Sequence, residues 1–295
     1  MKPAIPVVLF AYSRPDHLTR TLESLRSNEV PLIYAFSDGP KTPKQAGDVA
    51  KVREILRNVD WCAIDLCLRE ENLGLGRSVL TGVSAVLKKH DSAIVFEDDL
   101  ICVPGTYAYL TAALEHYESE PVVMSVTGWT HPLVTPKNVV DQPYFDGHGE
   151  SWVWGTWKRA WKGMEKDAKT LMGECRDKGI DVYRYGDALA AMAEEETKRN
   201  IWAIRFIYLQ ILKEGLCLRP PHSMVEHTGF DEMATNASDG TIWSNPPLKA
   251  CPPIPERWPP PIEHPECRPL WRSAWAMPKP SVPKRILRKI LRMLR

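Results

Sequence analysis

Several features that often identify a protein's class are missing from this sequence. Its seven cysteines are an odd number and form no C-x-x-C pair, so neither a disulfide framework nor a zinc site is expected. The apolar run near the N-terminus is interrupted after about six to eight residues, which is too short for a signal peptide or a membrane span. These absences favour a reduced, cytosolic protein.

The familiar phosphate-binding loops are also missing. The turn at residues 72–76 contains two glycines, but it matches neither G-x-G-x-x-G nor G-x-x-x-x-G-K-[ST]. A Rossmann-type dinucleotide site and a P-loop are therefore excluded. Any nucleotide has to be held by other groups.

The formal charge of +1 hides an asymmetry. Residues 279–295 hold seven Lys or Arg and no acid, so the rest of the chain carries 1 − 7 = −6. This mildly acidic body has no footprint for nucleic acid. Residues 282–295 place apolar and basic side chains on opposite helical faces, which predicts an amphipathic helix lying on the cytoplasmic membrane from its inner side. The alternative is a terminal helix docked on the acidic body.

The first half of the chain alternates short apolar runs with helix-like stretches, which is the pattern of an α/β sheet flanked by helices. Strands are predicted at 6–12, 32–36, 62–68 and 93–96, and helices at 17–27, 49–59 and 77–89. The second half is less regular. There the predicted elements are helices at 107–117 and 201–213 and a strand at 122–127.

Proline dominates the C-terminal part. Thirteen of the 38 residues from 246 to 283 are proline, with Trp258, Trp271 and Trp275 between them. Proline lacks a backbone N–H and is unfavourable inside helices and central strands. We therefore expect residues 241–281 to form an extended strap over the domain, without helix.

Polar groups follow three of the predicted strands. Ser13-Arg14, Asp38-Gly39 and the acids from Glu97 to Asp99 each stand at a strand's carboxyl end, where ligands of open α/β sheets gather. Three adjacent carboxylates repel one another unless a cation compensates, and Mg²⁺ or Mn²⁺ favours such oxygen ligands. The alternative is a helix-capping cluster or a solvated acidic turn.

Other polar candidates have equally plain structural alternatives. Asp38 fits a nucleobase or ribose edge, or a simple turn. Arg14 and Arg77 fit phosphates, or an ordinary surface. Single histidines such as His148, His222 and His227 are more often structural than ligands or bases.

Tryptophan is concentrated between residues 152 and 161. The block from Trp152 to Trp157 fits a platform on which a sugar ring stacks. Burial in the core is the equal alternative, because tryptophan covers much surface.

The blocks PVVLFAYSRPDHL, FSDGP, ENLGLGRSV, AIVFEDDL, ESWVWGTWKRAW and WAIRFIYLQILKEGLCLRP, taken in order, resemble GT-A-fold glycosyltransferases. The likeness is to the N-acetylglucosaminyltransferase I type and its bacterial relatives in surface-polysaccharide assembly. It covers about residues 4–240. The resemblance implies a Rossmann-like central sheet with helices on its faces, a nucleotide-sugar half at 1–105 and an acceptor half at 106–240, followed by the strap and the helix of 282–295.

The same resemblance implies roles for individual residues. Ser13 and Arg14 line the nucleotide site, Asp38 faces the nucleobase, and Arg77 also belongs to the donor side. Glu97 and Asp98 approach the ribose and sugar, and Asp99 is the direct ligand of Mn²⁺ or Mg²⁺. The acceptor side is formed by the loop around Glu150–Trp154 and by the segment from Trp202 that includes Arg205.

One departure from the family pattern concerns the catalytic base. A carboxylate is expected after the tryptophan of the last helix, but the sequence there reads Trp202-Ala203-Ile204-Arg205. An inverting displacement needs a base beside the acceptor oxygen. Glu150 and Asp231 are the candidates, with Glu226 and His227 behind them.

The predicted activity is transfer of a hexosyl or N-acetylhexosaminyl group from a nucleotide diphosphate, preferably UDP, to a glycan or lipid-linked saccharide. A nucleotidyltransferase of related fold is an alternative, although the Gly-rich loop it needs after the first strand is replaced by Tyr12-Ser13-Arg14-Pro15. The second alternative is a non-catalytic nucleotide- or glycan-binding protein at the membrane.

Overall fold

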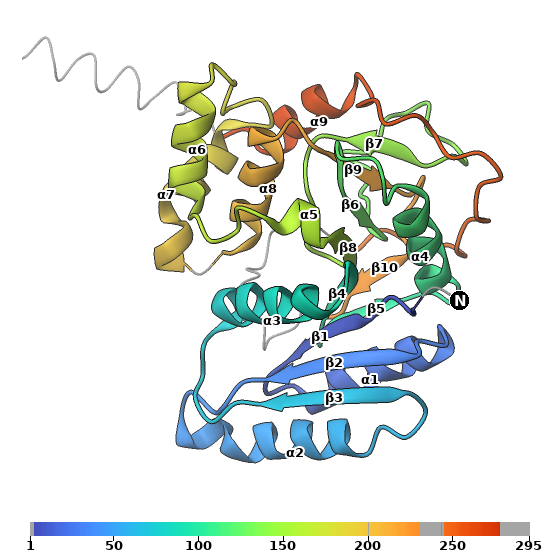
Figure 1. Ribbon diagram of the computed structural model, residues 1–295, viewed down its shortest axis with the longest axis vertical. Helices are drawn as coiled ribbons and strands as arrows, with labels where there is room; N and C mark the ends of the chain where they lie inside the picture. The colour runs from blue at the N-terminus through green and yellow to red at the C-terminus, as the bar shows by residue number, and fades with distance from the viewer. Residues whose placement is uncertain (1–2, 200, 230–242, 244, 278–295) are drawn as a thin grey trace, which may run out of the picture.

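A computed structural model describes residues 3–199, 201–229, 243 and 245–277. Its centre is an eight-stranded mixed sheet with the order β3-β2-β1-β4-β8-β6-β9-β7, flanked by helices (Figure 1). A second, two-stranded sheet pairs β5 with β10. The predicted α/β class with a central sheet and flanking helices is confirmed. Asp231 and residues 282–295, on which two predictions fall, lie outside the described residues.

The N-terminal half follows the predicted alternation closely. Strands β1, β2 and β4 are parallel neighbours, and β3 extends the sheet at its edge. Both faces of β1 are covered, so the strand is apolar throughout. The elements are β1 (Val7–Ala11), α1 (Pro15–Ser27), β2 (Leu32–Ser37), η1 (Pro43–Gln45), α2 (Ala46–Arg57), β3 (Ala63–Leu68), α3 (Leu75–Lys89) and β4 (Ser92–Glu97).

The second half contains more elements than the sequence predicts. Strand β8 lies antiparallel between β4 and β6, and so joins the two halves in one sheet. Helices α6, α7 and α8 gather at one end of the molecule (Figure 1). The elements are β5 (Leu100–Cys102), α4 (Thr106–His116), β6 (Val123–Thr127), β7 (Tyr144–Asp146), β8 (Trp154–Trp157), α5 (Lys158–Trp161), α6 (Ala168–Asp177), α7 (Asp187–Arg199), α8 (Ala203–Leu212), β9 (Leu216–Arg219) and β10 (Val225–His227).

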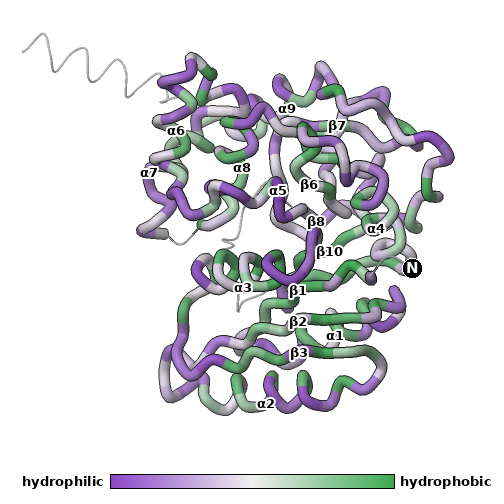
Figure 2. The backbone as a smooth tube through the Cα atoms, viewed as in Figure 1, coloured by the Kyte–Doolittle hydropathy of each residue, from purple (hydrophilic) through white to green (hydrophobic). Residues whose placement is uncertain are grey.

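Hydrophobic residues line the central strands, whereas the outer helices α6 and α7 alternate polar and apolar positions (Figure 2). Trp154 of β8 is fully buried and packs against Trp161, Trp202 and Phe206. Most of the tryptophan-rich block is therefore core, because large aromatic rings gain most when they leave water. Within the described ranges, no helix combines the length and apolar character needed to cross a bilayer.

The proline-rich segment is extended over most of its length, but it also contains a helix, α9 (Cys267–Ala274). The prediction that proline excludes helix is wrong at these residues. Pro269 stands in the first helical turn, where backbone N–H groups have no intrahelical partner, so its missing N–H costs little. The extended part packs along the domain: Tyr117 donates to the carbonyl of Pro259 at 2.6 Å, and His264 N–H donates to the carbonyl of Phe145 at 2.9 Å.

Candidate functional site

The carboxyl ends of β1 and β4 bring the predicted strand-end residues together. Phe10 of β1 is in register with Glu97 of β4, so the residues that follow each strand emerge at the same edge. The N–H of Tyr12 donates to Asp98 Oδ2 at 2.9 Å. The convergence expected from strand order is therefore observed for the residues that follow β1 and β4, and its centre is the acidic triplet.

Asp99 is the most enclosed of the three acids. Its Oδ2 accepts from Arg14 Nη1 at 2.8 Å and lies 3.8 Å from His227 Nε2. Its buried Oδ1 has no hydrogen-bond partner among the described residues. A buried carboxylate oxygen without a donor is costly, so this atom is the natural place for a further cation or donor.

The small sheet is what brings His227 to the acids. Strand β10 pairs with β5 so that His227 stands opposite Leu100, the residue after Asp99. The next residue, Thr228, donates its N–H to the Asp99 carbonyl at 2.8 Å. At Gly229 a side chain would overlap Asp99 Oδ2 and lie 2.7 Å from Arg14 Nη1. Residues 227–229 therefore form one wall of the Asp99 site.

The other two acids carry perturbed acidities. Burial and the neighbouring charge of Asp99 raise the pKa of Asp98 to about 7, although the Tyr12 N–H opposes the shift. Burial, Asp99 and Asp98 raise the pKa of Glu97 well above its usual range. Negative charge is thus in excess at this sheet edge.

This donor set suits a hard divalent cation. Asp99 offers a carboxylate oxygen and His227 a ring nitrogen beside it, and Mg²⁺ or Mn²⁺ typically takes one or two protein ligands together with phosphate oxygens. The described residues contain no group of three His, Cys, Asp or Glu side chains placed to hold a metal ion. The remaining ligands would have to come from a bound phosphate or from water.

Asp38 is buried and engaged on both oxygens. Arg69 Nη1 donates to Oδ1 at 2.7 Å, and the N–H groups of Leu73 and Gly74 each donate to Oδ2 at 3.0 Å. Asp38 therefore fixes the loop that leads into α3, which begins at Leu75. In this arrangement its carboxylate is already shared among protein donors, and the predicted contact with a nucleobase remains a prediction.

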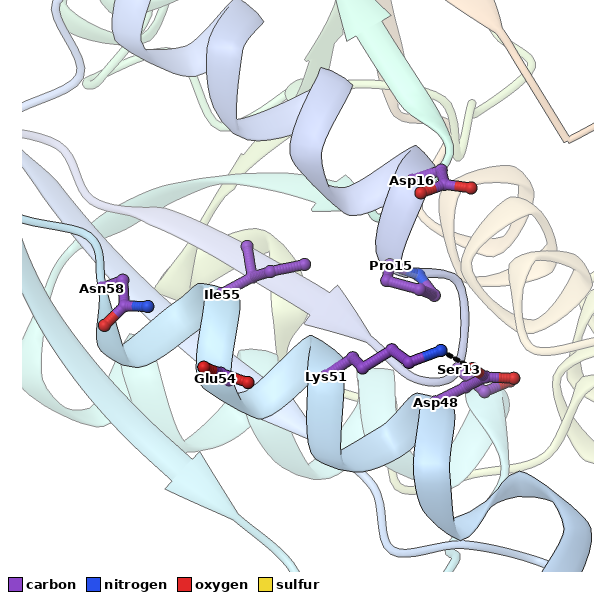
Figure 3. A pocket seen from close by; sticks show the side chains of 8 residues that line it. All are labelled: Ser13, Pro15, Asp16, Asp48, Lys51, Glu54, Ile55 and Asn58. Carbon is purple, nitrogen blue, oxygen red and sulfur yellow. Dashed lines mark hydrogen bonds and ion pairs between the residues drawn. The ribbon is translucent and has the colours of Figure 1, made fainter.

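Ser13 lines a hollow of about 590 Å³ between the start of α1 and α2 (Figure 3). Its charged lining comprises three acids, Asp16, Asp48 and Glu54, and a single base, Lys51, which pairs with Asp48 at 3.1 Å. A net negative wall disfavours phosphate groups. Arg77, the other predicted phosphate ligand, is exposed on α3.

The acceptor-side loop contains a strained residue. Val153 has φ 45°, in the left-handed region that a β-branched side chain rarely adopts. Its carbonyl is held by Gly128 N–H at 2.8 Å. The neighbouring Trp152 keeps part of its surface exposed and lies 4.7 Å from the His227 ring and 4.9 Å from the Trp129 ring, between centroids. Strain persists where the surroundings demand a conformation, which is common at binding sites.

Glu150 stands two residues before Trp152. Its Oε1 accepts from the N–H of Ser151 at 2.8 Å, and its Oε2 accepts from Arg219 Nη1 at 3.3 Å. Burial raises the pKa of Glu150, while the charge of Arg219 lowers it. The Glu150 side chain keeps 11% of its surface exposed, so it is a partly exposed acid in the loop that leads to Trp152.

Of the two residues assigned to the acceptor side, Trp154 is fully buried and Arg205 is partly buried in contacts within the protein. Trp154 is fully buried within β8, so the aromatic ring that reaches the surface in this loop is Trp152. Arg205 pairs with Glu196 at 2.9 Å and donates to the Met164 carbonyl at 3.1 Å, so its guanidinium joins α7 and α8. The burial of Trp154 agrees with the alternative of core packing, and the acceptor-side role of both residues remains a prediction.

The sequence pattern does not indicate Arg219 as a functional residue. Its side chain is completely buried, donates from Nε to Asp146 Oδ2 at 2.8 Å and from Nη2 to the His148 carbonyl at 3.0 Å. Trp271 of α9 donates to the same Asp146 oxygen at 2.6 Å. No local pattern marks these residues, because they come from β7, β9 and α9.

No family model and no curated protein matches the chain. Among solved structures, it is similar to the mannosyltransferase PcManGT from Pyrobaculum calidifontis, solved with GDP-Man and Mn²⁺, at 14% identity and a TM-score of 0.39, over 53% of this chain and 45% of that one. HddC from Yersinia pseudotuberculosis is similar at 16% identity and a TM-score of 0.32, over 52% and 77%. The chain thus spans less than half of the mannosyltransferase, and neither similarity assigns a family or a reaction.

Proposed function

We propose that this chain is a metal-dependent glycosyltransferase of the GT-A type, which moves a sugar from a nucleotide diphosphate, preferably UDP, to a glycan or lipid-linked saccharide. The observation that supports this most is the environment of Asp99. A buried carboxylate oxygen without a donor faces a site walled by His227 and Gly229, at the edge where strand ends converge. That combination suits a cation-bound diphosphate.

On this proposal the donor is held from two sides. Asp99 and His227 would hold Mn²⁺ or Mg²⁺, which when bound neutralises the charge of the departing diphosphate. Arg14, which now pairs with Asp99, lies within reach of the same phosphates and binds them through its planar fork. Glu97 and Asp98 line the sugar side. Asp38 contributes indirectly, by fixing the loop before α3.

The acceptor hydroxyl would be activated by Glu150. A general base has to sit near the acceptor oxygen, and its efficiency is greatest when its pKa approaches the working pH. Burial moves the pKa of Glu150 in that direction. Trp152, two residues after this acid, lies 4.7 Å from the His227 ring between centroids and would supply an aromatic face for a sugar ring. Displacement by the activated hydroxyl would invert the anomeric centre.

The proposal divides the chain into a nucleotide-sugar half, 1–105, and an acceptor half, 106–240. Such an enzyme acts in surface-polysaccharide assembly, and residues 282–295 would hold it at the inner face of the cytoplasmic membrane.

The test is a panel of nucleotide sugars, incubated with the full chain, Mn²⁺ and saccharide acceptors, with ³¹P NMR of the products. A glycosyltransferase releases the nucleoside diphosphate in an acceptor-dependent reaction. Pyrophosphate consumption or release would instead identify a nucleotidyltransferase. Binding without any product would identify a non-catalytic protein, and either result would overturn the proposal.

A further inference from the structure

A buried ionic cluster joins the acceptor loop to the C-terminal segment. Arg219 bridges two carboxylates, Asp146 at 2.8 Å and Glu150 at 3.3 Å. Trp271 supplies a second donor to Asp146. The side chains of Asp146 and Arg219 are fully buried, whereas that of Glu150 retains 11% of its exposure. One acid of the cluster therefore reaches the surface.

We propose that Arg219 is a positioning residue for catalysis, which fixes the orientation and the charge of the Glu150 carboxylate and is itself held by Asp146 and Trp271. This inference rests on the proposed function, because it takes Glu150 as the base.

The geometry restrains the Glu150 carboxylate at both oxygens. Ser151 N–H holds Oε1 and Arg219 Nη1 holds Oε2, so rotation of the group breaks one contact or both. Arg219 cannot follow, because its other donors bind Asp146 Oδ2 and the His148 carbonyl. A base held in this way loses little freedom when the acceptor binds.

A purely structural role accounts poorly for so much buried charge. Removing charges from water costs several kcal/mol for each ion, and an apolar set of similar volume is often as stable. Trp129 and Trp271 already flank the guanidinium, at 5.9 and 5.1 Å from their ring centroids. The charge of Arg219 is best explained by its effect on the orientation and the charge of Glu150, the one partly exposed acid of the cluster.

The charges around Glu150 act in opposite directions. Arg219 of β9 favours the ionised carboxylate, and Asp146 of β7 disfavours it. His148, on the same loop, is kept neutral because burial and Arg219 lower its pKa well below the usual range. Removing the positive charge should therefore raise the pKa of Glu150, and removing the negative charge should lower it.

The experiment measures these opposite shifts in the pKa of Glu150. Glutamate is labelled with ¹³C at the side-chain carboxyl, the Glu150 signal is assigned with Glu150→Gln, and its titration is followed in the full chain. Arg219→Gln should move the midpoint up by about one pH unit or more, and Asp146→Asn should move it down. Arg159→Gln is the matched control, since Arg159 binds backbone carbonyls of Tyr117 and Val123 and stacks on Trp157.

Kinetics provide the second readout. In Arg219→Gln we expect kcat to fall by about 10- to 100-fold with its acid limb moved to higher pH. The donor KM should stay within about threefold, because the donor binds at Asp99. Arg219→Lys retains the charge and should recover part of kcat.

If Arg219→Gln does not fold, Asp146→Asn and Arg219→Lys decide the matter. Unchanged midpoints, or midpoints that move in the same direction in Arg219→Gln and Asp146→Asn, would overturn the proposal. A general loosening of the structure would not move the two titration midpoints in opposite directions. If the wild-type chain transfers no sugar, the proposed function fails, and the carboxyl titration alone decides whether Arg219 controls Glu150.

Discussion

The protein contains two clusters of buried charge that differ in how completely they are satisfied. Around Asp99 negative charge is in excess, and one buried oxygen has no partner among the described residues. Around Arg219 both oxygens of Asp146 and both of Glu150 accept hydrogen bonds. We call the first cluster incomplete and the second complete with respect to their carboxylate oxygens, although both ring nitrogens of His148, which stacks on Trp271, also have no partner among the described residues. Substitutions around Asp99 should therefore reduce activity more than stability, and substitutions around Arg219 should reduce stability more than activity.

The largest loss of stability is expected when the complete cluster is broken. Arg219→Met leaves two buried carboxylates without their counter-charge, which should lower the free energy of unfolding by about 3–5 kcal/mol. Urea denaturation followed by circular dichroism measures it. Arg272→Met removes an exposed pair with Asp181 and should cost about 0–1 kcal/mol. Equal losses in the two variants would show that the buried ion pairs of Arg219 contribute no more to stability than the exposed pair of Arg272 with Asp181.

The incomplete cluster should behave in the opposite way. On the proposed function Asp99→Asn weakens the site of the cation, so turnover should fall by about 10²- to 10³-fold. Its free energy of unfolding should change little, because removing a like charge from the triplet opposes the loss of the ion pair with Arg14. Nucleotide-release assays and urea denaturation are the measurements. Asp65→Asn, at an exposed acid of β3, is the control and should change neither. A large stability loss in Asp99→Asn would contradict the contrast between the clusters.

Trp271 tests whether the C-terminal segment belongs to the complete cluster. Trp271→Phe keeps an aromatic ring stacked on His148, now 3.7 Å away, but removes the N–H that binds Asp146. The expected cost is about 1.5–3 kcal/mol, the range for a hydrogen bond to a charged group. Trp258→Phe, in an aromatic contact with Tyr109, is the comparison in the same segment. Thermal unfolding of both variants should show the larger loss for Trp271.

The smallest effect is expected at the wall of the Asp99 site. A methyl group at Gly229 would displace Arg14 and Asp99 from their present contact, so Gly229→Ala should weaken binding of a nucleoside diphosphate with Mn²⁺ by about tenfold, or 1.4 kcal/mol. Isothermal titration calorimetry measures this. Gly173→Ala, on α6 with open space around it, should leave binding intact and slightly raise stability. Unaltered affinity in Gly229→Ala would place the diphosphate elsewhere.

The two clusters also differ in how far the sequence predicts them. The acidic triplet is contiguous and follows an apolar strand, so strand order alone brings it to Arg14. The Arg219 cluster joins residues 146, 150, 219 and 271. Strands β7 and β9, which carry residues 146 and 219, are short and neighbour each other out of sequence order. Pairing of β7 with β9 is a tertiary event, and no periodicity records it.

The same distinction explains the element assignments. In the N-terminal half, continuous apolar runs and helical spacing predict strands and helices to within three residues at each end. In the tryptophan-rich block and just before it, β7, β8 and α5 are only three or four residues long, and burial of every strand residue removes the alternation that reveals a strand. The sequence therefore left core burial and a sugar platform as equal alternatives for Trp154. Helix α9 is not predicted from the proline content, because that reasoning does not account for a proline in a first helical turn, where it is compatible with a helix.

The hydrogen bond from Trp271 to Asp146 has a consequence for synthesis. A ribosome completes the strands of the N-terminal half early, and N-terminal parts of a protein generally fold first during synthesis. Asp146 and Arg219 are also made before residue 271, yet Asp146 meets its indole donor only when that codon has been translated. A nascent chain interrupted before this point would lack the indole N–H that binds Asp146, so the buried cluster is completed only when α9 has been synthesised.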